Sequence, residues 1–196
     1  MSPIKYLFAC LAFTLVAGAS FAPTALAQGT TVVVIDEGLL LRDSKAGKDM
    51  QVKLQSIETQ IKNELEPTRS ALEAEGKGLQ TRAQGKTQQA IAADTALVAE
   101  LQAYQTKANG FAQRRQALSQ ELALTERTAL VAFNKALEPV LMELVREKNA
   151  GLVLSRGQVV YASDATDVTR ALITKLDVTV PTVAVVRQRA PAQPTQ

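Results

Sequence analysis

The sequence of 196 residues has no histidine, no tryptophan and a single cysteine, Cys10. Cys10 lies within a predicted signal peptide, so the mature chain is expected to contain neither cysteine nor histidine. Such a chain forms no disulfide and no metal site with Cys or His ligands, and it lacks a Cys nucleophile and a His general base. Any catalysis would fall to Asp, Glu, Lys, Tyr or Ser alone. We therefore expect that the protein is not an enzyme.

The N-terminal residues have the order of a secretory signal peptide. Lys5 gives a short positive region, residues 7–19 are almost uniformly apolar, and Ala25-Leu26-Ala27 matches a small-residue cleavage site. The apolar run is too short to span a membrane. We therefore predict that residues 1–27 are a signal peptide that is removed on export.

Residues 45–149 are rich in Ala, Leu, Gln, Glu, Lys and Arg, which all favour helix. From Leu97 to Ala129 the seam positions alternate steps of four and three for more than four heptads, which predicts helices packed side by side as a coiled coil. Two polar residues, Arg115 and Thr125, fall on this seam. Two interpretations stay open: a narrow two-helix seam, or a flexible arm that leaves part of its surface free for a partner.

The helical run is expected to reverse its direction once. Three nearby glycines lower the helix propensity, so we place the turn between Gly85 and Asp94. At ~1.5 Å per residue, the resulting arm would be roughly 50 to 60 Å long. Pro67 should kink the first helix, and Pro139 should kink or restart the second near its base.

Short apolar segments flank the helical run and predict a small β body. Residues 31–36 form a continuous β-branched run, typical of a strand buried on both faces. Residues 152–154 and 159–161 are expected to be two strands of a hairpin. Asp167 stands directly before apolar residues at helical spacing, which indicates the N-cap of a short last helix. With Asp164 as a turn residue and Asp177 beyond that helix, we predict structural and not catalytic roles for these acids.

These elements predict an α+β fold in which a long antiparallel α-helical hairpin, a coiled-coil arm, projects from a small β body that oligomerises. The expected organisation is a signal peptide at 1–27, a β body from 28–44 and 150–178, a helical arm over 45–149, and a Pro-rich disordered tail over 179–196, which a short apolar clip could precede. One copy of such a body buries little, and small sheets are marginal alone. We therefore expect an oligomer core that contains Val32, Val34, Leu152, Leu154 and Val160.

Five short stretches stand in order around the predicted arm: Val32-Val33-Val34-Ile35-Asp36, Ser44-Lys45-Ala46-Gly47-Lys48, Leu152-Val153-Leu154, Val159-Val160-Tyr161-Ala162 and Asp167-Val168-Thr169. Their order and spacing over residues 30–177 resemble the Skp/OmpH family of periplasmic chaperones. The resemblance implies a jellyfish-shaped homotrimer whose three arms surround a cavity for unfolded outer-membrane β-barrel proteins. It also implies no ATP hydrolysis, no cofactor and a location in the periplasm of a Gram-negative cell.

Basic residues are concentrated between Lys77 and Arg115, where six bases and two acids give a net charge of +4. The six candidate client-binding residues are Lys77, Arg82, Lys86, Lys107, Arg114 and Arg115. A basic cavity would attract acidic chains, and an anionic membrane surface or lipopolysaccharide is a further candidate partner. For any one of these residues, an ordinary solvated helix face is the alternative.

A structural coiled-coil adaptor of a periplasmic envelope complex is the alternative function. Such adaptors carry sizeable β domains on both sides of the hairpin, whereas only about 15 residues precede it in the predicted mature chain. Nucleic-acid binding is disfavoured by the export signal, by the expected mature charge of +2 and by an aromatic content of 4%.

Overall fold

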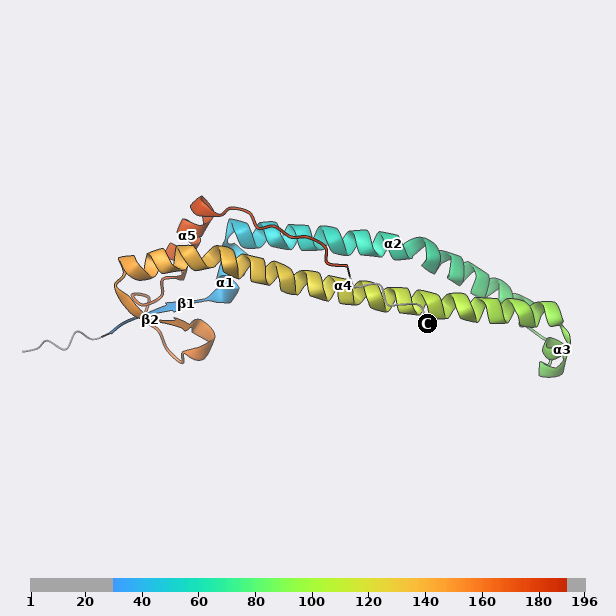
Figure 1. Ribbon diagram of the computed structural model, residues 1–196. Coiled ribbons are helices and arrows are strands. Elements are labelled where there is room, and N and C mark those ends of the chain that lie inside the picture. The colour runs from blue at the N-terminus through green and yellow to red at the C-terminus, as the bar shows by residue number, and fades with distance from the viewer. Residues whose placement is uncertain (1–29, 190–196) are drawn as a thin grey trace, which may run out of the picture.

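The computed structural model describes residues 30–189 and shows two long antiparallel helices that extend from a small body (Figure 1). Helix α2 (Lys45–Ala83) has 39 residues and helix α4 (Thr95–Glu147) has 53. At ~1.5 Å per residue they are roughly 60 and 80 Å long. The predicted fold, a helical hairpin on a small β-containing body, is confirmed.

The reversal at the far end of the arm lies between Ala83 and Thr95, as the sequence predicted. A short helix, α3 (Gln88–Ala93), forms the tip. Gly85 has a φ of +76°, a left-handed conformation that favours glycine. Asp94 then begins α4, because its Oδ1 accepts a hydrogen bond from the Leu97 N–H at 3.0 Å.

Neither proline ends its helix. Pro67 lies inside α2 and Pro139 inside α4, and both helices continue past these residues. Helix α2 bends in its distal half (Figure 1), which agrees with the expected kink of that helix. No restart occurs at Pro139.

The body is built around strand β1 (Thr31–Ile35). Strand β2 (Ala150–Ser155) pairs with it in parallel, with Val34 opposite Leu154. On the other side of β1, the Val34 N–H donates to the Thr166 carbonyl at 2.8 Å, and the Val168 N–H donates to the Val34 carbonyl at 3.0 Å. Val33, Val34 and Ile35 are all buried. The predicted strand that is buried on both faces is therefore confirmed, and the whole arm is the crossover between two parallel strands.

The predicted hairpin of residues 152–154 and 159–161 is wrong. Strand β2 is followed by a three-residue 3-10 helix, η1 (Arg156–Gln158), and residues 159–161 form no strand. Val160 is fully exposed, and Tyr161 is 82% exposed. The reason is that β2 pairs with β1, which precedes the arm. Two neighbouring apolar runs do not show whether a strand pairs locally or with a distant segment.

The core of the body is larger than one sheet and one helix, because the base of the arm contributes to it. Helix α1 (Glu37–Asp43), which the sequence analysis did not predict, contributes the fully buried Leu40. Helix α4 contributes Phe133, and helix α5 (Thr169–Thr179) contributes Leu172 and Leu176. These side chains form one cluster with Val33 and Ile35.

Helices α1 and α2 meet at a tight junction. The buried Ser44 ends α1, and its Oγ accepts a hydrogen bond from the Gly47 N–H at 3.0 Å to cap α2. Gly47 lies against the Leu41 backbone so closely that a Cβ there would be 2.1 Å from the Leu41 carbonyl oxygen. Asp177 also serves this junction, because its Oδ1 accepts from the Lys45 N–H at 2.7 Å. Asp177 lies inside α5, so its predicted position beyond the last helix is wrong.

Asp167 orders the start of α5 from one residue before the cap position, which Val168 occupies. The Asp167 Oδ1 accepts from the Thr169 N–H at 2.9 Å, and its Oδ2 accepts from Arg156 Nη1 at 2.9 Å. Burial raises the pKa of Asp167, but the bonds from Thr169 and the charge of Arg156 outweigh this and lower it. The structural role holds, whereas the predicted N-cap position is wrong by one residue.

Candidate functional site

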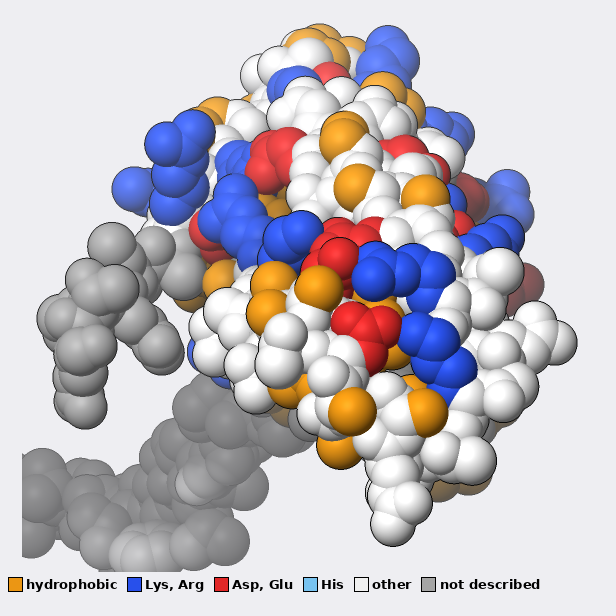
Figure 2. Space-filling view, turned by 90° about the vertical axis from the view of Figure 1, so that its right-hand side faces the viewer, with side chains coloured by type: hydrophobic (Ala, Val, Ile, Leu, Met, Phe, Trp, Pro, Cys, Tyr) orange, Lys and Arg blue, Asp and Glu red, His pale blue; other side chains and the backbone are white. Residues whose placement is uncertain are grey.

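The six predicted client-binding bases lie along the distal half of the arm, and four of them are in ion pairs with acids of the same arm. The pairs are Arg82–Glu100, Lys86–Asp94 at 2.8 Å, Lys107–Glu75 at 2.9 Å and Arg114–Glu64 at 3.3 Å. Seen from the tip of the arm, basic and acidic side chains lie next to one another (Figure 2). The distal arm is therefore a mixed surface and not a uniformly basic one.

This mixing has a topological cause. Antiparallel packing places the acids of α2 opposite the bases of α4, so the segment that folds together is residues 64–115. That segment has seven bases and six acids, a net charge of +1. Within the part of the chain that the structure describes, Lys77 and Arg115 make no ion pair. These two are the bases whose charge is least compensated.

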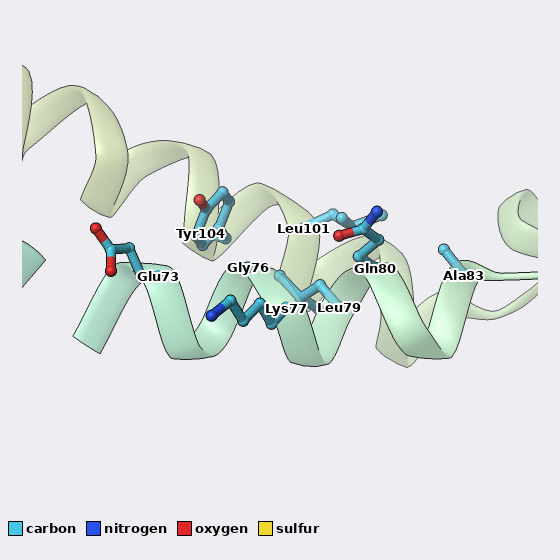
Figure 3. Close-up of a pocket in the computed structure, with 8 residues that line it drawn as sticks. All are labelled: Glu73, Gly76, Lys77, Leu79, Gln80, Ala83, Leu101 and Tyr104. Atoms are coloured by element: carbon cyan, nitrogen blue, oxygen red, sulfur yellow. The ribbon is translucent and has the colours of Figure 1, made fainter. Parts of the chain in front are cut away.

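A shallow hollow of about 490 Å³ lies between α2 and α4 near the arm tip (Figure 3). Leu79, Leu101 and Tyr104 give it apolar walls, and Lys77 stands at the same hollow. The Tyr104 ring lies against Gly76, where a Cβ would be only 2.9 Å from the tyrosine oxygen. The glycine that weakens the helix therefore makes room for the ring. The hollow combines apolar surface with one unpaired base and is too open to enclose a small molecule.

The C-terminal strap, residues 180–189, lies along α2 and α4 in the proximal half of the arm (Figure 1). Val183 is 4% exposed and belongs to the body core. Val185 packs against a second cluster formed by Ile57, Ile61 and Leu118. The predicted disordered tail is therefore wrong for residues 180–189. Residues 190–196 lie outside the described part of the chain.

Polar side chains of the arm hold the backbone of the strap at two places. The Val183 N–H donates to Asp49 Oδ2 at 3.0 Å, and its carbonyl accepts from Lys53 Nζ at 2.8 Å. Further along, the Gln188 N–H donates to Thr125 Oγ1 at 2.9 Å. The hydrogen bond from Lys53 lowers the pKa of Asp49, so this carboxylate stays ionised at neutral pH.

Arg187 joins the strap to both long helices. Its guanidinium bonds to Glu64 of α2 and to Glu121 of α4, the latter at 3.0 Å. The Arg187 side chain is 18% exposed and that of Glu121 is 7% exposed, so this pair is shielded from water. The hydrogen bond from Arg187 lowers the pKa of Glu64. Arg187 was missed at the level of sequence, although alternation of Val183, Val185 and Arg187 was available as a signal.

The strap accounts for one polar residue of the predicted helical seam, Thr125, and for a buried acid beside that seam, Glu121. Thr125 is fully buried and receives the Gln188 N–H, and the buried Glu121 receives Arg187. Arg115, by contrast, is exposed and lies off the buried seam. Neither interpretation included this arrangement, in which a further segment of the same chain covers the surface that the two proximal helices leave free.

The five residues expected in an oligomer core have different environments in the single chain. Val34 is buried in the chain's own core, and Val32 and Leu154 are half-buried. Leu152 is 47% exposed, and Val160 is fully exposed. Leu152 and Val160 are therefore the members of this set that a second copy could contact.

Two classes of site receive no support within residues 30–189. No group of three or more His, Cys, Asp or Glu side chains in this range could hold a metal ion. No helix in the same range combines the length and apolarity of a membrane span. The predicted signal peptide, residues 1–27, lies outside the described residues.

Comparison with known proteins gives one family, and several chains of solved structures match. The family model for outer membrane proteins (OmpH-like) matches residues 31–176. One of these structures is that of an OmpH-like protein from Caulobacter crescentus, described as a proposed outer membrane chaperone. It is 26% identical, superposes with a TM-score of 0.70, and the match covers 84% of this chain and 94% of that one. No curated protein matches the chain.

Proposed function

This chain belongs to the OmpH-like family, and from that premise we propose that it is an ATP-independent periplasmic holdase chaperone. It binds unfolded outer-membrane β-barrel proteins between helical arms and prevents their aggregation. The observation that carries the proposal is a long arm whose surface combines exposed apolar side chains with interleaved charges. Val131 of α4 is 61% exposed, Met142 is 47% exposed, and Val52 of α2 is 66% exposed.

Such a surface suits clients that have no common shape. Unfolded barrel strands share an alternation of apolar and polar residues but differ in sequence, so one enclosed pocket shaped for a single sequence would hold few of them. Many weak apolar contacts spread along an arm can hold such chains, and exposed charges keep the arm soluble between clients. The hollow beside Tyr104 is open and shallow, which agrees with distributed contacts and not with one specific ligand.

Assembly as a homotrimer is part of the proposal. Exposed Leu152, Val160 and Tyr161 on the body, together with strand β2 at the edge of the sheet, offer apolar and backbone groups that a neighbouring copy could cover. The periplasmic location rests on the family and on the predicted signal peptide. The arms of three copies would then surround the client.

The function is tested by aggregation of an unfolded outer-membrane β-barrel protein diluted from urea. The mature chain, residues 28–196, should suppress light scattering at a stoichiometric ratio without ATP. Equal scattering with and without the chain would contradict the holdase function. Analytical ultracentrifugation of the same sample should give the mass of a trimer.

Charge reversal tests how clients are captured. Replacing all six distal bases with Glu should slow capture of an acidic barrel protein at low salt by tenfold or more, because electrostatic steering raises association rates by about 10–10³-fold. The effect should weaken as salt screens it, with a Debye length of roughly 8 Å at physiological ionic strength. Stopped-flow fluorescence of a labelled client measures the rate.

The ion pairs sharpen this experiment. The double variant Lys77→Glu and Arg115→Glu reverses the two unpaired bases. It should produce much of the slowing of client capture that replacing all six bases produces. The matched control is Arg127→Glu with Lys135→Glu, which makes the same change in charge on the proximal part of α4. If the variant with all six bases replaced captured the client at an unchanged rate in low salt, the bases would be only a solvated surface.

A further inference from the structure

The C-terminal strap has the side-chain pattern of a β-strand although it pairs with no strand among the described residues. Val183, Val185 and Arg187 face the arm, whereas Ala184 and Val186 face solvent, and Val186 is 66% exposed. A period of two is the geometry of an extended chain. The strap is therefore an extended peptide with alternating apolar residues, seated on helices.

The surface beneath the strap recognises main-chain atoms. Asp49 accepts the N–H of Val183, and Lys53 donates to the carbonyl of the same residue. Thr125 accepts the N–H of Gln188 five residues later. Every residue offers a carbonyl, and every residue except proline offers an N–H. These contacts would therefore hold extended chains of many sequences.

The same surface receives alternate side chains. The cluster of Ile57, Ile61 and Leu118 receives Val185, and the carboxylates of Glu64 and Glu121 receive the cationic Arg187. Backbone contacts for affinity and pockets for alternate side chains are also combined where an extended peptide binds at the edge of a sheet. We call this surface, which the strap covers, the proximal groove. It consists of the residues of α2 and α4 that contact the strap: Asp49, Lys53, Ile57, Ile61, Glu64, Leu118, Glu121 and Thr125.

We infer that the proximal groove is a binding site for an extended segment of an unfolded barrel protein, and that the C-terminal strap is its built-in competitor. The segment that fits has two apolar residues in alternation and a cation two residues further on, which is the order of Val183, Val185 and Arg187. The inference rests on the proposed function, because it specifies where on the arm a client strand is held.

Competition follows from the way the strap is attached. It follows α5 directly, so its local concentration at the groove is high, on the order of millimolar for a short tether. A single weak segment of a folded protein would not displace it. An unfolded barrel protein offers many alternating segments at once, and its contacts elsewhere on the arm raise their local concentration as well. The strap would thus keep the groove covered until a client is engaged.

A reversible lock tests the inference in the full mature chain. Leu118→Cys with Val185→Cys places two thiols within the side-chain cluster in which Val185 of the strap packs against α4, in a chain that has no other cysteine after residue 27. Oxidation should join the strap to α4 and lower affinity for an unfolded barrel protein at least fivefold. Reduction should restore it. Each single-cysteine variant, treated in the same way, is the control for oxidation itself.

A second variant opens the groove. Val185→Asp with Arg187→Glu removes the apolar contact and sets a carboxylate against Glu64 and Glu121. This variant should bind a fluorescent peptide with the sequence of residues 180–189 at least tenfold more tightly than the unaltered chain does, measured by anisotropy. The matched control is Val186→Asp with Arg189→Glu, which makes the same charge change on the exposed side of the strap. Its peptide binding should equal that of the unaltered chain.

The outcomes separate the inference from the proposed function. Equal client affinity in the locked and reduced forms would overturn the inference and leave holdase activity standing. If neither form prevented aggregation, the proposed function would fail, and the peptide experiment would still decide whether the groove binds extended chains. If the opened variant bound no peptide while its circular dichroism was unchanged, the strap would be only a brace between α2 and α4, and the inference would be overturned.

Discussion

Val34→Asp is expected to leave the chain largely unfolded. Val34 is 3% exposed, and its N–H and carbonyl both bond to the segment before α5 while its neighbours pair with β2. A carboxylate at this site would lie in the apolar centre of the body, without a cation beside it to balance its charge. Burial of an unpaired charge is among the few changes that cost more than about 4 kcal/mol. Because domains are stable by only about 5–15 kcal/mol, most of the fold should be lost.

Far-UV circular dichroism and urea titration measure this loss. The matched control is Leu152→Asp, which introduces the same side chain on β2 at a position that is 47% exposed. This variant should keep its helical signal. If the proposed trimer forms through the exposed body surface, Leu152→Asp should dissociate it. Analytical ultracentrifugation should then give a lower mass for this variant than for the unaltered chain. A Val34→Asp protein that unfolds cooperatively at the urea concentration of the unaltered chain would contradict the central role of β1.

A related prediction concerns how the thermal midpoint of the unaltered chain depends on protein concentration. If association and folding are coupled, as the proposed trimer implies, the midpoint should rise with protein concentration. The core seen in the single chain is larger than the sequence indicated, since Leu40, Phe133 and Leu172 all join it. A folded, stable monomer at micromolar concentration would therefore exclude an obligate trimer without contradicting the fold.

The arm was predictable because its signals are local. Helix propensity and a heptad seam are both properties of a short window, and so is the change of composition around Gly85. Helix α1 could have been predicted from Asp36, because Asp is a favoured N-cap residue. In the structure its Oδ1 accepts a hydrogen bond from the Leu39 N–H at 2.8 Å. That signal was missed because Asp36 directly follows a strong β-branched run and only seven helical residues come after it.

The pairing of β2 was not predictable from a local pattern. Its partner, β1, lies on the other side of the whole arm, and the apolar run of residues 159–161 offered a closer candidate that the chain does not use. The prediction of a basic distal arm was wrong for the same reason. Counting along the sequence from Lys77 omits Glu64 and Glu75, which antiparallel packing brings opposite Arg114 and Lys107.

The strap shows how composition can mislead about order. Prolines and the lack of acids after residue 180 indicated disorder. However, composition ignores alternation, and Val183, Val185 and Arg187 fall on one side of an extended chain. Their partners are Asp49, the apolar cluster at Ile57, and the carboxylates on both helices, none of which are near in sequence. A polar seam residue such as Thr125 was the remaining hint that something else packs there.

Gly47→Ala should destabilise the chain by about 3 kcal/mol, at the upper end of the usual cost of overpacking. The added Cβ would lie 2.1 Å from the carbonyl oxygen of Leu41 and 2.7 Å from its carbonyl carbon. Both are backbone atoms, so no side chain can move aside. Relief requires α1 and α2 to separate, which would disturb the fully buried Leu40 and Ala46.

The same helix supplies the control for this change. At Gly78 of α2 no heavy atom outside the adjoining helix backbone lies within 4 Å of an added Cβ, so Gly78→Ala should stabilise the chain by about 0.5–1 kcal/mol through helix propensity alone. Urea titration of the two variants should therefore shift the midpoint in opposite directions. If Gly47→Ala were as stable as Gly78→Ala, the junction of α1 and α2 would not need its glycine. In that case Ser44, which caps α2 through the Gly47 N–H, would be the residue that fixes the angle between the two helices.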